Sequence, residues 1–399
     1  MPLSAITNSL PAGNKKIMSQ PVYITNIAAF LPNAPVANEA MEAILGQVGR
    51  RPSRARKLIL RSNRITARYY AIDPATGATT HSNTQLAAAA VRRLAEQGCD
   101  LDTVELLACG TTLPDQLLPN HALMVHGELG LAPCEVIATA GICLAGMTAL
   151  KYCYLAIRSG EHNNGVATGS ENVSAGMRGR SFTEETGAEA ELLAKAPEIA
   201  FAKDFLRWML SDGAGAVWMS AKPRANGLSL RIDWIFQKSY AGELETCMYA
   251  GAEKMADGSL QGWREYRPQQ WLDQSIFAIQ QDVKLLNDRI IEYTVTRPLQ
   301  ELVAQGKIKA DQIDWFLPHY SSGFFRDKVA VGMEAAGCTI PQDKWFTNLS
   351  TKGNTGSASI YIMLEELFNS GRLQPGETLL CYIPESGRFS TAFMQLTVV

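Results

Sequence analysis

The sequence predicts an α/β fold built from two similar halves. Short apolar runs alternate with Ala- and Leu-rich helical stretches along the 399 residues, a pattern typical of strands and helices packed in layers. The second half repeats the order of the first at matching offsets. Cys143 lies 17 residues before Gly160, and Asn354 lies 17 residues before Gly371. These offsets predict a duplication in which Cys143 and Asn354 occupy equivalent places, each just before a central helix.

Each element of the first half is expected from its composition and from the residue that ends it. Strands are expected where short apolar runs are bounded by glycine or polar residues. Leu144–Arg158 is rich in Ala, Leu and Met and is followed by Gly160, which is typical of a buried helix with a glycine stop. The expected strands are Val104–Cys109, Gly165–Gly169 and Ala214–Ser220.

The second half shows the same succession. Ile313–Leu317 is an expected strand that ends at Pro318-His319, and Gly356–Phe368 is an expected helix. Two further strands are expected at Thr378–Ile383 and Thr391–Val398.

The boundaries of the halves follow from these elements. The first half is expected over about 21–222 and the second over 228–399, after a loose tail at 1–20. An acidic, Ala-rich stretch within about 177–205 is expected to be an insertion in the first half.

Composition excludes several classes of protein. With 46% hydrophobic and 19% charged residues, the chain has enough material for a core and is not a disordered chain. The net charge of −2 without a basic block argues against a nucleic-acid partner. We expect no membrane helix, because no run of 18 apolar residues occurs. The eight cysteines show no Cys-x-x-Cys spacing, so we expect no metal site and a cytoplasmic protein with reduced thiols.

The most informative segment is Ala-Gly-Ile-Cys-Leu-Ala-Gly around Cys143. It is a turn of small residues that places a cysteine at the start of an apolar helix. The positive end of the helix dipole and the unpaired N–H groups there favour the thiolate, which is the nucleophilic form. Taken alone, such a cysteine is more often a structural residue of the core.

Two polar side chains of the second half change that interpretation. His319 follows an expected strand at its carboxyl end, where α/β sheets place functional groups. Asn354 lies on the glycine-flanked turn Lys-Gly-Asn-Thr-Gly, and each of the two also fits a purely structural role. Together with Cys143 they supply a nucleophile and two side chains able to bind an oxyanion.

With these segments the sequence resembles the β-ketoacyl-acyl-carrier-protein synthase III group of the thiolase superfamily, from about Val22 to Val399. The resemblance implies a five-layered αβαβα thiolase fold, usually as a homodimer. It also implies that no metal or redox cofactor is needed and that substrates arrive as thioesters of acyl carrier protein or coenzyme A. The segments that carry it are GICLAG at Cys143, LPH at His319, KGNTGSAS at Asn354, GSE at Gly169–Glu171 and SDGAGAVWM at Ser211–Met219.

The resemblance further implies a role for each residue of the site. Cys143 would hold an acyl group covalently. His319 Nε2 and the Asn354 amide would stabilise an enolate formed from a malonyl or β-ketoacyl thioester, which attacks the acyl group in a Claisen condensation. The backbone N–H of Cys143, with an amide of the Ser386-Gly387 turn, would hold the tetrahedral oxyanion.

Departures from the family pattern favour a ketosynthase of specialised metabolism, such as polyketide or fatty-acid-like pathways. Pro384-Glu385-Ser386 stands where the family has three glycines, so this pocket wall is altered. Enzymes that join two acyl chains head to head carry a glutamate about 24 residues before the cysteine, where this chain has Pro119. Asp115 is the nearest acid and fits a loop role, while Cys381, inside an expected strand, fits a structural role rather than that of a second thiolase cysteine.

The entrance to the site also departs from the family. The tryptophan of typical members is missing from Lys57–Arg64, while Arg61 remains. Arg326 and Lys328 follow the histidine and suit phosphate or an acidic partner. This set favours an acyl carrier protein over free coenzyme A as the substrate carrier.

Three functions remain open on the sequence. The first is a ketosynthase that forms a carbon–carbon bond. The second is an acyltransferase that moves the Cys143 acyl group to an alcohol or amine, but it would have no need of both His319 and Asn354. The third is a non-catalytic partner subunit, which the presence of Cys143 argues against.

Overall fold

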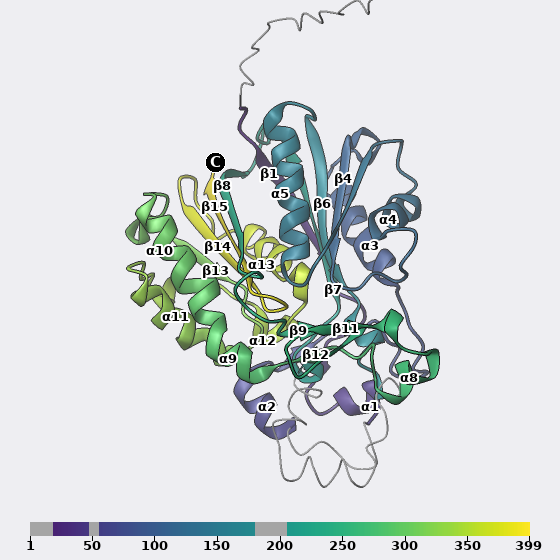
Figure 1. Ribbon diagram of the computed structural model, residues 1–399. Coiled ribbons are helices and arrows are strands. Elements are labelled where there is room, and N and C mark those ends of the chain that lie inside the picture. The colour runs from purple at the N-terminus through teal and green to yellow at the C-terminus, as the bar shows by residue number, and fades with distance from the viewer. Residues whose placement is uncertain (1–18, 48–55, 180–205) are drawn as a thin grey trace, which may run out of the picture.

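The computed structural model describes residues 19–47, 56–179 and 206–399. Residues 1–18 of the expected tail, and nearly all of the expected insertion, lie outside the described residues. The main strands form one mixed sheet in the order β13-β14-β15-β8-β1-β7-β6-β4-β5 (Figure 1). Their bounds are β1 Tyr23–Phe30, β4 Leu106–Thr111, β5 Glu135–Ala140, β6 Asn164–Glu171, β7 Gly213–Ser220, β8 Leu230–Ser239, β13 Trp315–Pro318, β14 Thr378–Glu385 and β15 Ser390–Val398.

The strand order confirms the predicted duplication. The first half runs β5-β4-β6-β7-β1, and the second runs β13-β14-β15-β8. The place that corresponds to β5 is taken in the second half by one parallel bridge, Phe316↔Trp345. The two parts meet where β1 and β8 pair antiparallel at Tyr23↔Arg231 and Ile24↔Leu230. The residue boundaries of the two halves remain a proposal.

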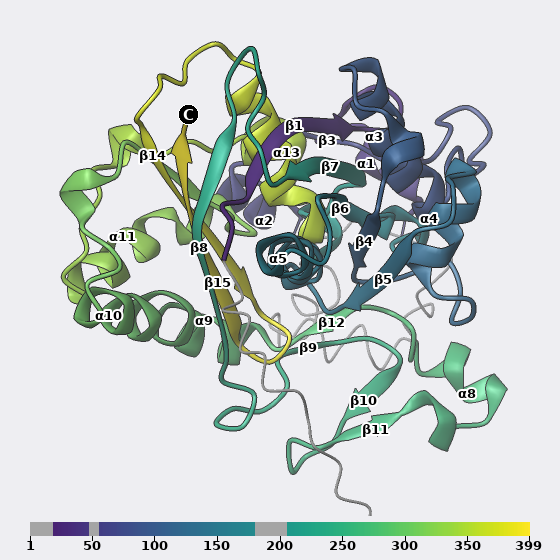
Figure 2. The ribbon, with the colours of Figure 1, turned by 90° about the horizontal axis from the view of Figure 1, so that it is seen from above.

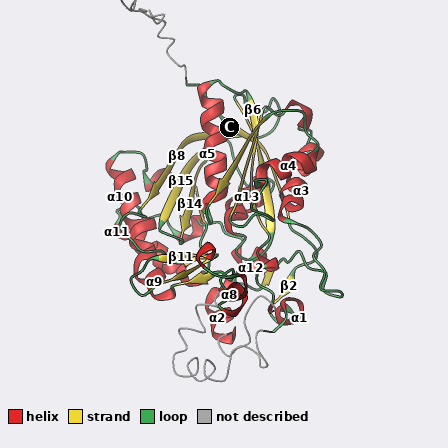
Figure 3. Cartoon of the chain, turned by 45° about the vertical axis from the view of Figure 1, so that its right-hand side comes forward, coloured by secondary structure: helices red, strands yellow, loops and turns green. Residues whose placement is uncertain are grey.

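The helices complete five layers. Two central helices lie between the strands of the two halves (Figures 2 and 3), a third and fourth cover the outer face of the first half, and three cover that of the second. The central pair is α5 (Leu144–Ser159) and α13 (Ser359–Phe368). The outer helices are α3 (Asn83–Glu96), α4 (His121–Leu129), α9 (Val283–Ile291), α10 (Arg297–Ala304) and α11 (Arg326–Ala335).

The central helices approach closely near their N-terminal ends. A Cβ atom at Gly146 would lie 2.4 Å from the backbone oxygen of Ser357, so only glycine permits this crossing. The Tyr361 hydroxyl donates to the backbone oxygen of Gly146 at 2.7 Å. This contact brings the turn before α5, which carries Cys143, beside the turn before α13, which carries Asn354.

A long excursion, residues 240–282, joins β8 to α9 and packs on the hairpin turn between β14 and β15. The backbone N–H groups of Cys247 and Met248 donate to the Gly387 oxygen at 2.7 and 3.2 Å. The excursion also holds an aromatic cluster of Trp263, Trp271 and Phe277. Its elements are β9 Met248–Tyr249, β10 Ala252–Lys254, β11 Leu260–Gly262, α8 Pro268–Asp273 and β12 Gln280–Gln281.

The remaining helices and strands are short, and α1 and α2 among them lie at the bottom of the molecule in Figure 1. They are β2 Val36–Ala37, α1 Met41–Leu45, α2 Arg56–Asn63, β3 Ala67–Arg68 and α12 Leu349–Lys352. Within the described residues, no helix combines the length and apolar character needed to cross a membrane.

Candidate active site

Cys143 immediately precedes α5, as predicted, and follows β5 after two residues. Its side chain is buried. Burial raises the pKa of the Cys143 thiol well above its usual range, and the carboxylates of Glu171 and Glu385 raise it further. The expected thiolate is therefore wrong for the free site, because desolvation and two nearby charges outweigh the helix dipole. The resting nucleophile is a thiol.

His319 directly follows β13 at its carboxyl end, as predicted. The His319 backbone N–H donates to the backbone oxygen of Tyr382 at 2.8 Å, and this bond fixes His319 against β14. Burial lowers the pKa of the imidazole to about 4, so His319 is neutral at pH 7. Neither ring nitrogen has a hydrogen-bond partner among the described residues. One nitrogen is thus free to donate and the other to accept a proton.

Asn354 lies between α12 and α13, where its backbone is held on both sides. Its N–H donates to Met209 at 3.0 Å, and its oxygen accepts from the Ser211 N–H at 2.8 Å. The side-chain Oδ1 accepts from the Gly356 N–H at 3.0 Å. These contacts orient the side chain and leave Nδ2 without an acceptor in the described part of the chain. The Asn354 amide is therefore a preorganised donor.

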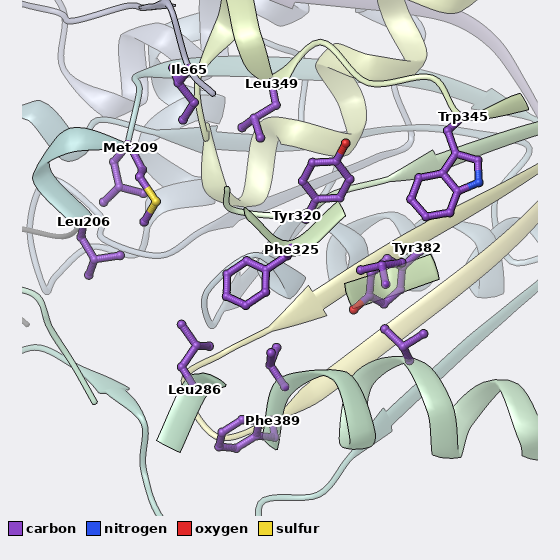
Figure 4. Close-up of a cluster of buried hydrophobic side chains, with 14 of the residues drawn as sticks. Ile65, Leu206, Met209, Leu286, Tyr320, Phe325, Trp345, Leu349, Tyr382 and Phe389 are labelled. Atoms are coloured by element: carbon purple, nitrogen blue, oxygen red, sulfur yellow. The ribbon is translucent and has the colours of Figure 1, made fainter. Parts of the chain in front are cut away.

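Cys143 and His319 open into the same cavity. Ser386 forms part of the same wall, and Asn354 is not among the lining residues. Most of the other walls are apolar and come from α9, α11 and the segment before α11. Figure 4 shows Leu286, Phe325 and Tyr382 pointing toward one another in the hydrophobic cluster beside it. The apolar lining residues include Leu286, Ile290, Ile291, Phe325, Val329 and Tyr382.

The hairpin turn between β14 and β15 carries the predicted Ser386-Gly387 pair. The Gly387 N–H donates to the Glu385 carboxylate, and the oxyanion role expected of an amide in this turn stays a prediction. A Cβ atom at Gly387 would lie 2.3 Å from Glu385 Oε1, which explains the glycine. Ser386 alone of the predicted pair faces the cavity with Cys143.

Two buried carboxylates near the nucleophile were not among the predicted site residues. Glu171 ends β6, and its Oε1 accepts from the Thr112 hydroxyl at 2.5 Å and from the N–H groups of Thr112 and Ser357 at 3.1 Å. Burial raises the pKa of Glu171 to about 7. Burial also raises the pKa of Glu385, although the N–H groups of Gly387, Arg388 and Ser390 oppose this rise. A carboxylate at the end of an apolar strand was the available sequence signal in both cases.

Comparison with known proteins supports the family resemblance over nearly the whole chain. Residues 303–383 match the family described as 3-oxoacyl-[acyl-carrier-protein (ACP)] synthase III C terminal. A β-ketoacyl-[acyl-carrier-protein] synthase III of Xanthomonas oryzae pv. oryzae is 23% identical over 368 residues, which cover 91% of this chain and 95% of the relative. That of Laribacter hongkongensis is 28% identical over 295 residues, covering 73% and 76%.

Solved structures show the same fold. AbyA1, a tetronic acid condensing enzyme, matches with a TM-score of 0.71 at 19% identity over 94% of this chain and 99% of that structure. OleA of Xanthomonas campestris, solved with lauric acid and lauroyl-CoA, matches with a TM-score of 0.68 at 18% identity over 95% and 99%. Over most of its length the chain is therefore similar to synthases of the β-ketoacyl-acyl-carrier-protein synthase III type, and it has the fold of their solved structures.

The three predicted entrance residues lie near the cavity of this synthase-III-like protein. Arg61 is exposed on α2, which packs against the turn Gly323–Phe325 before α11. Arg326 Nε donates to Gln342 at 2.8 Å, and its guanidinium lies over the Trp345 ring at 5.2 Å. Lys328 Nζ lies 4.1 Å from the centre of the Phe324 ring. Arg61 is thus the most open of the three cations.

Two further residues have the structural roles that the sequence favoured. The Asp115 carboxylate accepts from the N–H groups of Asn83 and Thr84 at 2.8 and 2.9 Å, which stabilises the start of α3. Cys381 is buried inside β14 opposite Met394.

Proposed function

We propose that this protein is a ketosynthase that joins a Cys143-bound acyl group to a malonyl or β-ketoacyl thioester. The observation that carries the proposal is the cavity shared by Cys143 and a neutral His319 whose ring nitrogens are unengaged. The Asn354 side-chain oxygen is occupied by the Gly356 N–H. The Asn354 Nδ2 group is therefore available as the second hydrogen-bond donor of the proposed reaction.

The acylation step follows from the protonation states. Cys143 rests as a thiol because burial raises its pKa, so its proton must leave as Sγ attacks the substrate carbonyl. The neutral His319 imidazole accepts that proton, and the departing carrier thiolate takes it back. A neutral thiol and a neutral imidazole suit a dry cavity, since neither is charged before the substrate binds.

Condensation uses the same groups as donors. Loss of carbon dioxide from a malonyl thioester leaves an enolate oxygen, and a β-ketoacyl thioester forms the same kind of enolate when neutral His319 accepts a proton from its acidic carbon. His319 and the Asn354 amide donate to this oxygen, and the enolate carbon forms a new bond to the acyl carbonyl of Cys143. The C–S bond then breaks, and the Cys143 thiolate that leaves takes a proton from His319 in the β-ketoacyl route or from water in the malonyl route. Each such donor is worth about 10²–10³ in rate.

The partners of this reaction belong to the proposal. Arg61 on α2 and Arg326 and Lys328 on α11 lie on helices beside the cavity, and their positive charges suit an acidic acyl carrier protein. All eight cysteines are free thiols, which fits the expected cytoplasmic location.

A homodimer is supported by the open edge of the sheet. The edge strand β5 has partly exposed side chains, and the exposed apolar residues Tyr152 and Leu155 lie on α5 beside it. An unpaired edge with apolar neighbours is a template for pairing with another chain.

The test compares second substrates by product analysis. Malonyl, β-ketoacyl and simple acyl thioesters are each offered on carrier protein and on coenzyme A after the enzyme has been acylated. We expect carbon–carbon products from the first two, best on carrier protein, and a mass adduct that is absent in Cys143→Ala. Efficient joining of two simple acyl thioesters, or transfer of the acyl group to an alcohol or amine without a new carbon–carbon bond, would contradict the proposal.

A further inference from the structure

The cavity wall beside Cys143 carries a hydroxyl with a fixed orientation. Gln281 Nε2 donates to Ser386 Oγ at 3.1 Å, and this contact occupies a lone pair of the hydroxyl oxygen. The hydroxyl proton is then left to donate elsewhere. Its nearest acceptor in the described structure is the Met248 sulfur at 4.0 Å, and a thioether is a weak acceptor that an oxygen would displace.

Gln281 is held rigidly in place to make this contact. Its side chain is buried, with 3% of its surface exposed. The residue pairs with Met248 in the β9–β12 ladder, and the next residue, Asp282, donates its N–H to the Cys247 oxygen at 2.7 Å. A buried amide is costly unless it is hydrogen-bonded. The excursion at 240–282 therefore places a preorganised polar group behind the hydroxyl of Ser386.

The cavity has both polar and apolar lining. Cys143, His319 and Ser386 share it with Leu286, Ile290 and Val329. An acyl chain bound to Cys143 therefore has aliphatic side chains to pack on and the Ser386 hydroxyl in the same cavity. A plain hydrocarbon chain would leave that hydroxyl without an acceptor.

We propose that Ser386, oriented by Gln281, binds an oxygen carried on the acyl group near its thioester, so that the site selects 3-oxoacyl or 3-hydroxyacyl groups over plain acyl groups. Ser386 is the group that touches the substrate, and Gln281 is a positioning residue. The inference rests on the proposed function, because it requires an acyl group on Cys143.

The experiment measures selectivity rather than total rate. Purified full-length protein is offered equal amounts of 3-oxohexanoyl- and hexanoyl-coenzyme A, then 3-hydroxyhexanoyl- and hexanoyl-coenzyme A, and the two Cys143 adducts are counted by intact mass. We expect the oxygen-bearing adduct to dominate in the wild type. Ser386→Ala should lower the ratio about tenfold, the effect of one lost hydrogen bond, and Ser386→Thr should restore it.

Two further variants separate orientation from folding. Gln281→Met keeps the length of the side chain but loses the donor, and it should lower the ratio in the same direction as Ser386→Ala. Ser321 also lines the cavity but has no hydrogen-bond partner in the described part of the chain. Ser321→Ala therefore removes a hydroxyl that nothing orients, and it should leave the ratio unchanged.

The outcomes distinguish the inference from the function beneath it. An unchanged adduct ratio in Ser386→Ala, or an equal loss of both adducts, would overturn the selective role. An equal change of ratio in Ser321→Ala would do the same. Absence of any Cys143 adduct in the wild type, whether the acyl groups are offered on coenzyme A or on carrier protein, would overturn the proposed function and the inference together.

Discussion

The outer edges of the two halves differ although their strand orders match. In the first half, β5 pairs with β4 over six residues and leads into the turn of Cys143. In the second half, the corresponding place holds, among the described residues, a single bridge at Trp345, whose ring packs on Phe316 at 5.0 Å. The Trp345 indole N–H donates to the Ile340 oxygen at 2.9 Å, so this edge is closed by the chain itself.

The two halves share a strand order but supply different chemical groups to the site. The first half keeps an open edge and presents a thiol from a short turn. The second half has a closed edge, and its connection from that edge to Asn354 is longer than the turn between β5 and Cys143. It supplies the neutral side chains of His319 and Asn354. In the proposed reaction, covalent capture belongs to the first half and enolate stabilisation to the second.

The largest expected effect separates these two tasks. His319→Ala and Asn354→Ala each remove a donor from the second half, so condensation should fall by about 10²–10³. Asn354→Ala should still take up the acyl group on Cys143, which intact mass measures in the same samples. His319→Ala should also slow acylation, because in the proposed acylation step His319 accepts the thiol proton. Wild-type condensation in either variant would refute the division.

A smaller effect is expected where the halves touch. Gly146→Ala would place a Cβ atom 2.4 Å from the Ser357 oxygen, and overpacking of this kind costs about 1–3 kcal/mol. The free energy of unfolding in urea should fall by that amount. Gly127→Ala, in α4, meets no atom within 4 Å and should leave stability equal or slightly higher. Equal stability of the two variants would show that the crossing does not need glycine.

The smallest expected effect is on the reactivity of Cys143, whose pKa is raised by a carboxylate from each half. Glu171 of the first half and Glu385 of the second both raise the pKa of Cys143, Glu171 by more. Glu171→Gln should therefore speed alkylation of Cys143 several-fold at pH 8, and Glu385→Gln should do so by less. Peptide mapping by mass identifies the alkylated thiol.

The pH dependence of that difference has a defined sign. The pKa of Glu171 is raised to about 7, so its negative charge is present above pH 7 and is lost below it. The gap between wild type and Glu171→Gln should be open at pH 8 and close toward pH 6. A gap that is constant with pH would assign the effect to altered packing instead of charge.

Local patterns predicted the parts of the fold that depend on neighbouring residues. The expected helix Leu144–Arg158 differs from α5 by one residue, and the expected strand Thr378–Ile383 lies within β14. Periodicity and glycine stops are properties of a short segment, and the turns of Cys143, His319 and Asn354 follow from the elements that end there.

The parts that sequence reasoning missed depend on contacts between distant segments. Glu171 Oε1 accepts from the Ser357 N–H, 186 residues away. The capture of the Gly387 amide by Glu385 depends on the geometry of a hairpin turn, and the burial of Cys143 depends on both halves at once. A carboxylate at the end of an apolar strand marks Glu171 and Glu385 in the sequence, but no pattern along the chain reports which distant groups they contact.

The two central helices also limit how the chain can be divided. Helix α13 is buried along most of its length, and α5 buries residues from Leu144 to Ile157 against strands of both halves. A fragment that ends at the connection 221–229 would expose α5 to water, and its complement would expose α13. Either fragment produced alone should therefore aggregate. The two fragments produced together should assemble into one folded unit, because each covers the apolar helix that the other exposes.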